Sequence, residues 1–139
     1  MAKRLKKIPS PQNIVKYLPQ AIRKGLPADI GIAEVSEKES RRLNLIYRDK
    51  NKSANVLSFF YSKEYGEIIV CPAVMRREAK EQKHSYEYQF AWMIVHGMIH
   101  LSGLHHEKSG AVATRVLTLE KAVLSKIYQE DDSELGIRK

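Results

Sequence analysis

The chain has 139 residues, 43% hydrophobic and 29% charged, with 24 lysines and arginines against 16 acids and a formal net charge of +8. This length predicts a single domain, residues 1–139, with one hydrophobic core. A single cysteine excludes an intrachain disulfide framework and agrees with a cytoplasmic protein. No stretch reaches the roughly 20 apolar residues of a membrane span, so no membrane partner is expected. The basic balance is typical of a solvated surface or of a polyanion-binding one.

The chain opens on a basic segment, residues 1–9, which we expect to be a frayed tail. No long apolar run follows it, so it is not interpreted as a secretory signal. Ser10 and Pro11 then predict a helix start, because serine caps a helix and proline fits its first position. Pro19 predicts an interruption of this helix, since its nitrogen cannot donate a hydrogen bond.

A short strand over residues 29–35 precedes the second predicted helix. Ser36 and Glu39 have the spacing of a capping box, which places the start of that helix between them. Its apolar positions predict a buried stripe made of Leu43, Ile46 and Tyr47.

Two strands are predicted next, over residues 55–61 and 67–71, separated by a loop of hairpin length. Cys71 ends the second strand and is expected to be a buried thiol. A charged helix over residues 73–83 follows. Strands in one block with helices around them predict an α+β fold of one small domain.

The apolar run over residues 90–101 predicts a buried helix that Ser85 caps and Gly103 ends. Residues 112–128 predict a last helix with a stripe of Val112, Val116, Leu119, Val123 and Ile127. Residues 130–139 are expected to fray.

A metal site is predicted from three histidines that lie in and just after the run over residues 90–101. His96 and His100 are four residues apart and share one helix face, and His106 can fold back after the Gly103 turn. Three neutral imidazoles with one open position form the ligand set of a catalytic zinc site. His105 adjoins His106, so the identity of the third ligand stays open. The alternative is that these are core histidines.

The segment HGMIHLSGLHH, residues 96–106, resembles the HGxLHLxGxDH signature of the YbeY family, described as metal-dependent endoribonucleases that act in rRNA maturation. His105 stands where that family has aspartate. Residues 43–48 and 55–59 resemble the family's LNxxYR and TDVLSF block, with Ala54 and Asn55 in place of Thr-Asp, and residues 66–68 resemble its GDI strand. The resemblance covers about residues 43–124.

This resemblance implies a mixed β-sheet packed by helices, with the metal on a central helix. It implies a cytoplasmic, zinc-dependent endoribonuclease, a hydrolase specific for single-stranded RNA that acts in rRNA processing, ribosome biogenesis and ribosome quality control. The implied partners are rRNA and the ribosomal subunit, and protein partners, ribosomal or GTPase, stay open. One Zn²⁺ per chain is expected at His96, His100 and His106.

Arg48 matches an arginine of the family block and is implied to line the cleft. A guanidinium can meet the charge that builds on phosphate oxygens with two parallel N–H bonds, which lysine cannot. The alternative is a helix-end arginine that binds carbonyl groups. Ser58 and Asn55 are expected to be structural.

Gly97 stands where the zinc-peptidase motif HExxH has its general base, which argues against proteolysis. Glu120 can replace that base, although a salt bridge or a hydrogen bond to a ligand histidine is the preferred interpretation. The remaining alternatives are another zinc hydrolase, a metallopeptidase among them, and a ribosome-assembly protein with a structural metal.

Overall fold

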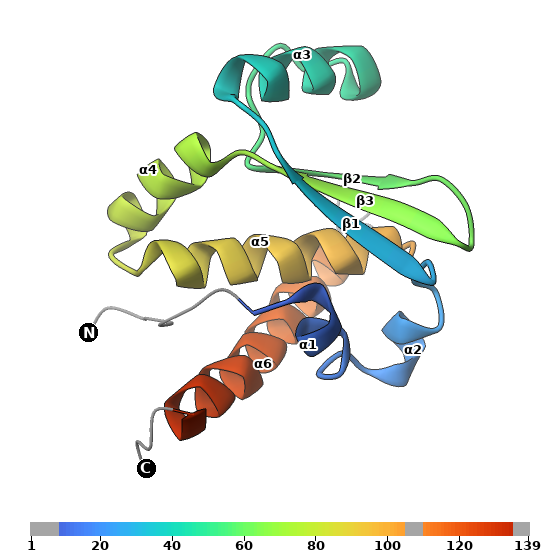
Figure 1. The fold of residues 1–139 in the computed structure, drawn as a ribbon, viewed down its shortest axis with the longest axis vertical. Helices are drawn as coiled ribbons and strands as arrows, with labels where there is room; N and C mark the ends of the chain where they lie inside the picture. Colours follow the sequence, from blue (N-terminus) through green and yellow to red (C-terminus); the bar gives the residue numbers. More distant parts are fainter. Residues whose placement is uncertain (1–8, 105–109, 135–139) are drawn as a thin grey trace.

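The computed structural model describes residues 9–104 and 110–134 (Figure 1). The elements follow the chain in an α+β order, which confirms the predicted fold class. They are α1 (Pro11–Val15), α2 (Gln20–Arg23), β1 (Asp29–Glu34), α3 (Glu37–Arg48), β2 (Val56–Phe60), β3 (Tyr65–Val70), α4 (Pro72–Gln82), α5 (Tyr86–Leu101) and α6 (Gly110–Glu134). Among the described residues, no helix is long and apolar enough to cross a membrane.

The three strands form a mixed sheet in the order β1-β3-β2. β1 runs parallel to β3, pairing Asp29 with Tyr65 and Glu34 with Val70. β2 is antiparallel to β3, as the hairpin-length loop between them predicts. The connection from β1 through α3 therefore carries the chain across to the far edge of the sheet, next to β3.

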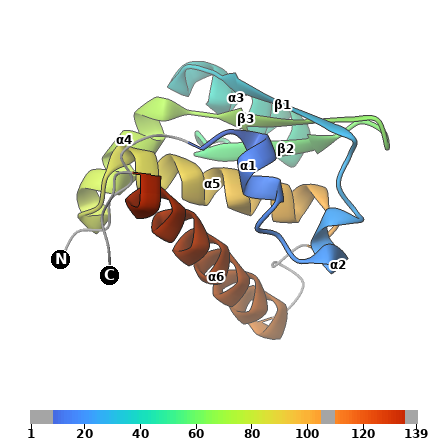
Figure 2. The ribbon, with the colours of Figure 1, turned by 60° about the horizontal axis from the view of Figure 1, so that its bottom comes forward.

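Helix α5 lies at the centre of the molecule. It packs against β2, β3, α4 and α6, and Figure 2 shows it between the sheet and α6. Its buried residues include Ile94, Val95, Met98 and Ile99, each with no exposed surface. The apolar run over residues 90–101 is therefore a helix buried on nearly every side, as the sequence predicted.

The predicted helix boundaries at the N-terminus are confirmed. The Ser10 hydroxyl accepts a hydrogen bond from the Asn13 amide at 3.2 Å, with Pro11 at the first helical position. The chain leaves the helix after Val15 and begins α2 after Pro19, which serves as its cap residue. Ile14 and Leu18 nevertheless face the core, so the interrupted segment still buries one apolar side.

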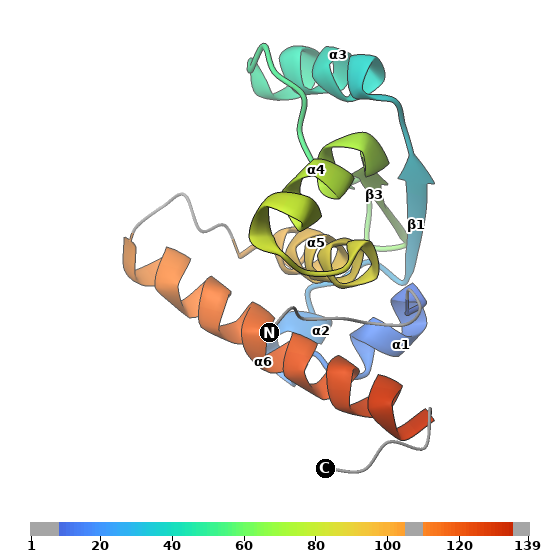
Figure 3. The same cartoon turned by 90° about the vertical axis from the view of Figure 1, so that its left-hand side faces the viewer.

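The predicted buried stripe of α3 is wrong at two of its three positions, since only Leu43 is half-buried. Ile46 is 56% exposed and Tyr47 is 62% exposed, whereas Ser40 and Asn44 are buried. Figure 3 shows the reason, because α3 lies at one end of the molecule, away from α5 and α6. The helix faces the polar segment that follows it rather than the apolar core, so its hydrogen-bonding residues point inward.

Helix α6 runs past the predicted end at residue 128 and continues to Glu134. Its buried apolar residues are Val116, Val123, Leu124 and Ile127, with Leu119 half-buried, which confirms most of the predicted stripe. The fraying expected over residues 130–139 is wrong for residues 130–134, which continue α6. The Val112 side chain, residues 1–8 of the tail expected over 1–9, and residues 135–139 lie outside what the structure describes.

Candidate metal centre and catalytic cleft

The histidine helix α5 forms as the sequence predicted. The Ser85 hydroxyl accepts a hydrogen bond from the Tyr88 amide at 3.1 Å, and Glu87 lies in the first turn, where the helix dipole favours a negative charge. The helix ends at Leu101, and Gly103 follows with φ +99°, a conformation that glycine adopts without a steric penalty. These local signals fix where the two histidines of this helix lie.

His96 and His100 point the same way from α5. Their ring centroids are 4.5 Å apart and the ring planes are inclined by 42°. Both residues are partly buried, so the pair lies at the border between the core and solvent. This is the arrangement that two ligands of a single ion need on one turn of a helix.

Glu120 of α6 supports His96 from behind. Its Oε2 atom lies 2.5 Å from His96 Nδ1, and its Oε1 atom accepts a hydrogen bond from Trp92 Nε1 at 2.9 Å. The residue is only 3% exposed. Both carboxylate oxygens are therefore engaged, which matches the preferred interpretation of Glu120 as a partner of a ligand histidine.

The Glu120 bond also leaves Nε2 as the ring nitrogen of His96 that would bind a metal. With Nδ1 turned to the carboxylate, Nε2 is the nitrogen that faces away from α6, and carboxylate–histidine–metal triads have this geometry. The donors present fit a divalent metal of the zinc type. The other two candidates, His105 and His106, lie outside the described residues, within which no group of three potential ligands gathers.

Two cavities flank the histidine pair. One of about 350 Å³ is lined by His100 together with Arg48, Ser58, Phe60 and the Gly25 and Ser102 turns. The other, of about 250 Å³, lies on the α6 side and includes His96, Glu120 and Asn55. The pair therefore separates a cavity that holds an arginine from a cavity that holds the supporting carboxylate.

Arg48 is the last residue of α3, and the structure brings it to His100 from the other side of β2. Its Nη2 atom donates a hydrogen bond to the Ser58 carbonyl oxygen at 3.2 Å. The acceptor is thus a carbonyl of an edge strand rather than of its own helix. The side chain is exposed and lines the same cavity as His100.

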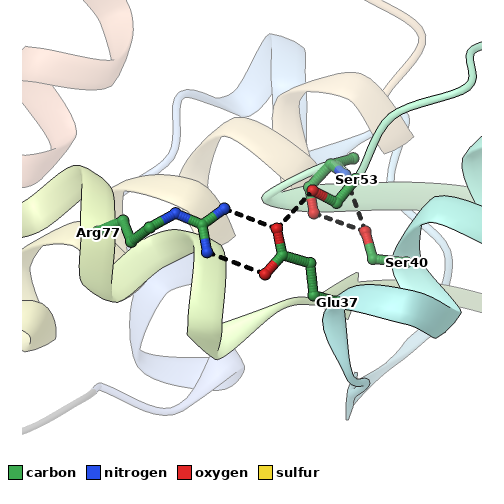
Figure 4. A network of polar contacts seen from close by, with 5 residues as sticks. Glu37, Ser40, Ser53 and Arg77 are labelled. Atoms are coloured by element: carbon green, nitrogen blue, oxygen red, sulfur yellow. Dashed lines mark hydrogen bonds and ion pairs between the residues drawn. The ribbon is translucent and has the colours of Figure 1, made fainter.

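The position of Arg48 depends on how α3 is held. Figure 4 shows Glu37, at the start of α3, bonded to both terminal nitrogens of Arg77 from α4, at 2.9 and 2.7 Å. Ser53 also donates to Glu37, and Ser40 both donates to the Ala54 carbonyl and accepts from the Ala54 amide. The Arg77 and Ser53 bonds lower the pKa of Glu37 to about 2.

Gly97 has a packing role in this site. A Cβ atom there would lie 3.0 Å from the Ser58 hydroxyl and 3.1 Å from Ile68 Cγ2, so α5 approaches the sheet too closely for a larger side chain. The Ser58 hydroxyl donates to the Gly97 carbonyl at 3.0 Å. Ser58 is therefore structural, as expected, and the missing peptidase base has a steric reason.

A polar network behind the site was not foreseen. The Asn55 amide nitrogen donates to both carboxylate oxygens of Glu78, Gln89 also donates to Glu78, and His84 bonds Gln89. Gln89 is 1% exposed and is the one polar side chain among the buried residues of α5. That buried amide was the sequence signal for this network, because a buried polar side chain requires a partner.

Comparisons with known proteins identify the family of the chain. The model of the endoribonuclease YbeY family matches residues 4–128 of the chain. This chain belongs to the YbeY family. An Acinetobacter baumannii relative named endoribonuclease YbeY is 39% identical, with 73% of this chain and 75% of the relative covered. An Aromatoleum aromaticum relative of the same name is 42% identical, covering 72% of this chain and 66% of its own.

The fold also has a solved counterpart. The solution structure of a Thermotoga maritima protein aligns with a TM-score of 0.58 at 23% identity, covering 96% of this chain and 93% of that one. At this identity the likeness concerns the fold alone. The resemblance to the YbeY family drawn from the histidine motif is thus confirmed, and the mixed sheet with its central helix is the expected architecture.

Proposed function

We propose that this YbeY family member is a zinc-dependent endoribonuclease that cuts single-stranded RNA during rRNA maturation in the cytoplasm. The observation that carries the proposal is the cavity that holds both His100 and Arg48. It joins a metal-binding helix face to a fixed positive charge, which is the combination that phosphodiester cleavage requires.

His96 and His100, with His106 as the third ligand, would hold one Zn²⁺ ion. A zinc ion bound by three neutral ligands supplies a bound water whose pKa is lowered to about 7. Within the described residues, Glu120 fixes the orientation and the protonated nitrogen of His96. A second imidazole one turn away on the same helix face supports a shared ion over the alternative of two core histidines.

Arg48 would meet the charge on the scissile phosphate. The guanidinium carries five N–H donors in a planar fork, and negative charge builds on the non-bridging phosphate oxygens as the bond breaks. Its bond to Ser58 orients the side chain over the edge of β2 toward the cavity. The net charge of +8 adds a long-range attraction for a polyanion such as rRNA.

The peptidase alternative is weaker. Gly97 cannot act as a base, and close packing against Ser58 and Ile68 leaves no room for one at that position. Glu120, the other candidate, is buried, and its two carboxylate oxygens are hydrogen-bonded to His96 and Trp92. The other alternative is a ribosome-assembly protein with a structural metal. Removal of the metal would then unfold the domain, whereas in a nuclease it would abolish RNA cleavage and leave the domain folded.

Arg48→Ala separates catalysis from metal binding. Arginine is not a zinc ligand, so the variant should keep its metal while RNA cleavage falls by about 10²–10³-fold. Arg48→Lys should restore little, because a point charge does not reproduce the fork. Arg42→Ala is the matched control, an exposed arginine of the same helix that pairs with Glu39, and it should cut RNA normally. Wild-type cleavage by a folded, metal-loaded Arg48→Ala protein would remove Arg48 from the mechanism.

A further inference from the structure

Four aromatic side chains form a continuous row on the face of the sheet opposite α5. We call this row the aromatic stripe, and it consists of Tyr47, Phe59, Tyr61 and Tyr65. Ser58 points to α5, where its hydroxyl reaches the Gly97 carbonyl. Residues alternate faces along a strand, so Phe59 and Tyr61 point the opposite way. Figure 1 shows α5 on one side of the sheet and α3 on the other, with the β2–β3 hairpin extending past α3.

The rings of the stripe are in contact from end to end. Tyr47 meets Phe59 edge to face at 5.3 Å between centroids. Phe59 and Tyr61 are 6.3 Å apart with planes inclined by 16°, and Tyr61 and Tyr65 are 5.7 Å apart and inclined by 6°. The last three rings are therefore close to parallel, and aromatic pairs in offset stacks are mutually stabilising.

Two neighbours hold the stripe in place. The Tyr61 hydroxyl donates to Glu67 Oε1 at 3.2 Å. The pKa of the Tyr61 phenol is raised, first by partial burial and second by this bond. A Cβ atom at Gly31 would lie 2.5 Å from the Tyr65 hydroxyl oxygen. Because Gly31 of β1 has no side chain, Tyr65 has room to lie across the sheet.

The stripe is ordered but exposed. Tyr47 is 62% exposed, Tyr61 58% and Tyr65 39%. A contiguous group of large aromatic side chains at the surface is characteristic of a binding site rather than of a solvated face. The rings of Phe59, Tyr61 and Tyr65 do not belong to the core, which lies on the other side of the sheet around α5.

The stripe adjoins the cavity of the proposed active site. Tyr47 and Arg48 are consecutive residues at the end of α3, one in contact with the stripe and the other lining the cavity with His100. An RNA strand that left the cavity at Arg48 would cross the open edge of β2 and meet Phe59 and Tyr61 directly. The geometry points to a role for the stripe as a stacking platform for unpaired bases of single-stranded RNA, an inference that rests on the proposed nuclease function.

Charge favours contact through bases rather than through phosphates. The Glu67 carboxylate lies beside Tyr61 inside the stripe, where it would repel a phosphate. Arg48 lies at the cavity end and attracts one. Every base has a π-face that can stack on tyrosine or phenylalanine, so the platform would accept RNA with little sequence preference.

The test measures binding of a fluorescent 2′-O-methylated, cleavage-resistant RNA to the purified protein, beside a strand of equal length whose nucleotides lack bases. Tyr61→Ala combined with Tyr65→Ala should weaken binding of the base-containing strand by roughly 25- to 100-fold, the lower range for two lost base–ring stacks. Binding of the abasic strand should not change. Tyr61→Phe combined with Tyr65→Phe keeps both rings and should bind as wild type.

Leu45→Ala is the matched control. Leu45 is an exposed apolar residue of α3, with 46% of its surface accessible. It lies two residues before Tyr47 and therefore faces the opposite side of the helix, away from the aromatic stripe. Its RNA affinity should equal that of wild type.

Three outcomes would overturn the stacking platform. The alanine pair could bind the base-containing strand as tightly as wild type, or it could lose equal affinity for the abasic strand. The stripe could instead prove to be a protein surface, with wild type dimerising in solution and the alanine pair monomeric at unchanged RNA affinity. Wild type that leaves ordinary RNA uncut but still shows ring-dependent binding would contradict the proposed nuclease function and support the platform.

Discussion

Helices α5 and α3 carry the two halves of the candidate site, and they are held in the fold by different forces. α5 buries eleven of its residues, most of them apolar, against the sheet and two further helices, α4 and α6. α3 buries two, Ser40 and Asn44, and both are polar. Burial of apolar surface is non-directional and large in total, about 25 cal/mol per Å², whereas a hydrogen bond adds about 1 kcal/mol net and requires its geometry.

This difference divides the site into a rigid part and a part that depends on polar contacts. The histidine pair is fixed by the core, which suits a metal site that tolerates little displacement. Arg48 is placed by a helix that rests on Ser40, Asn44 and the ion pair between Glu37 and Arg77. Changes in α5 should therefore act on metal binding, and changes in α3 on the position of Arg48.

The largest effect is expected at the metal. His100→Ala removes one of the proposed ligands from the rigid helix and should reduce zinc from about one ion per chain to almost none, measured by elemental analysis of the purified protein. His84→Ala is the matched control, since His84 is a partly buried histidine that bonds Gln89 away from the pair. Full zinc content in the His100 variant would refute the metal-site assignment.

Glu120→Gln tests the support behind His96. Glutamine keeps the shape and can still accept from Trp92, but it removes the negative charge that faces His96 Nδ1. Loss of such an outer partner typically weakens metal affinity by about 10- to 100-fold. Competition with a chromophoric chelator measures this shift, and an unchanged affinity would reduce Glu120 to a packing residue.

The features that the sequence predicted well are local ones. Ser10, Ser36 and Ser85 cap their helices because a cap needs only its own hydroxyl and an amide three residues on. Gly103 ends α5 through its own backbone conformation. The histidine pair is local in the same sense, since helical spacing alone brings His96 and His100 together.

The features that the sequence missed depend on distant parts of the chain. The apolar residues of α3 suggested a core-facing stripe, but its partner is the polar segment around residues 52–54, so Ser40 and Asn44 turned inward. The aromatic stripe could not be foreseen either. Alternation puts Phe59 and Tyr61 on one face, but only the placement of α5 decides which face is covered. His106 stays a prediction.

Ser40→Ala tests the claim that hydrogen bonds hold α3. The Ser40 hydroxyl is buried and satisfies both the amide and the carbonyl of Ala54. Its removal leaves two backbone groups without that partner and should lower the free energy of unfolding by about 1–3 kcal/mol in urea titrations. Ser125→Ala, at an exposed position of α6, should change little. Equal stability of the two variants would mean that α3 is held by something other than this contact.

The smallest effect is expected at the ion pair that ties α3 to α4. The Arg77 and Ser53 hydrogen bonds lower the pKa of Glu37 from 4.5 to about 2. Because the folded-state value is depressed, the pair stabilises the protein above pH 4.5 and loses that contribution as pH falls toward 2. Both side chains are largely exposed, so solvent screens the pair and overall stability should respond weakly.

The direct measurement is a carbon NMR titration of the Glu37 carboxyl group. Arg77→Ala should move its midpoint from about 2 upward toward 4.5, since the largest cause of the shift is gone. Glu39 is the internal control, because its pKa is lowered by Arg42 on the same helix and not by Arg77. Amide exchange should then quicken in α3 and not in α5 if the two helices are held as described. A Glu37 midpoint that stays near 2 without Arg77 would show that the bonds from Arg77 are not the main cause of the lowered pKa.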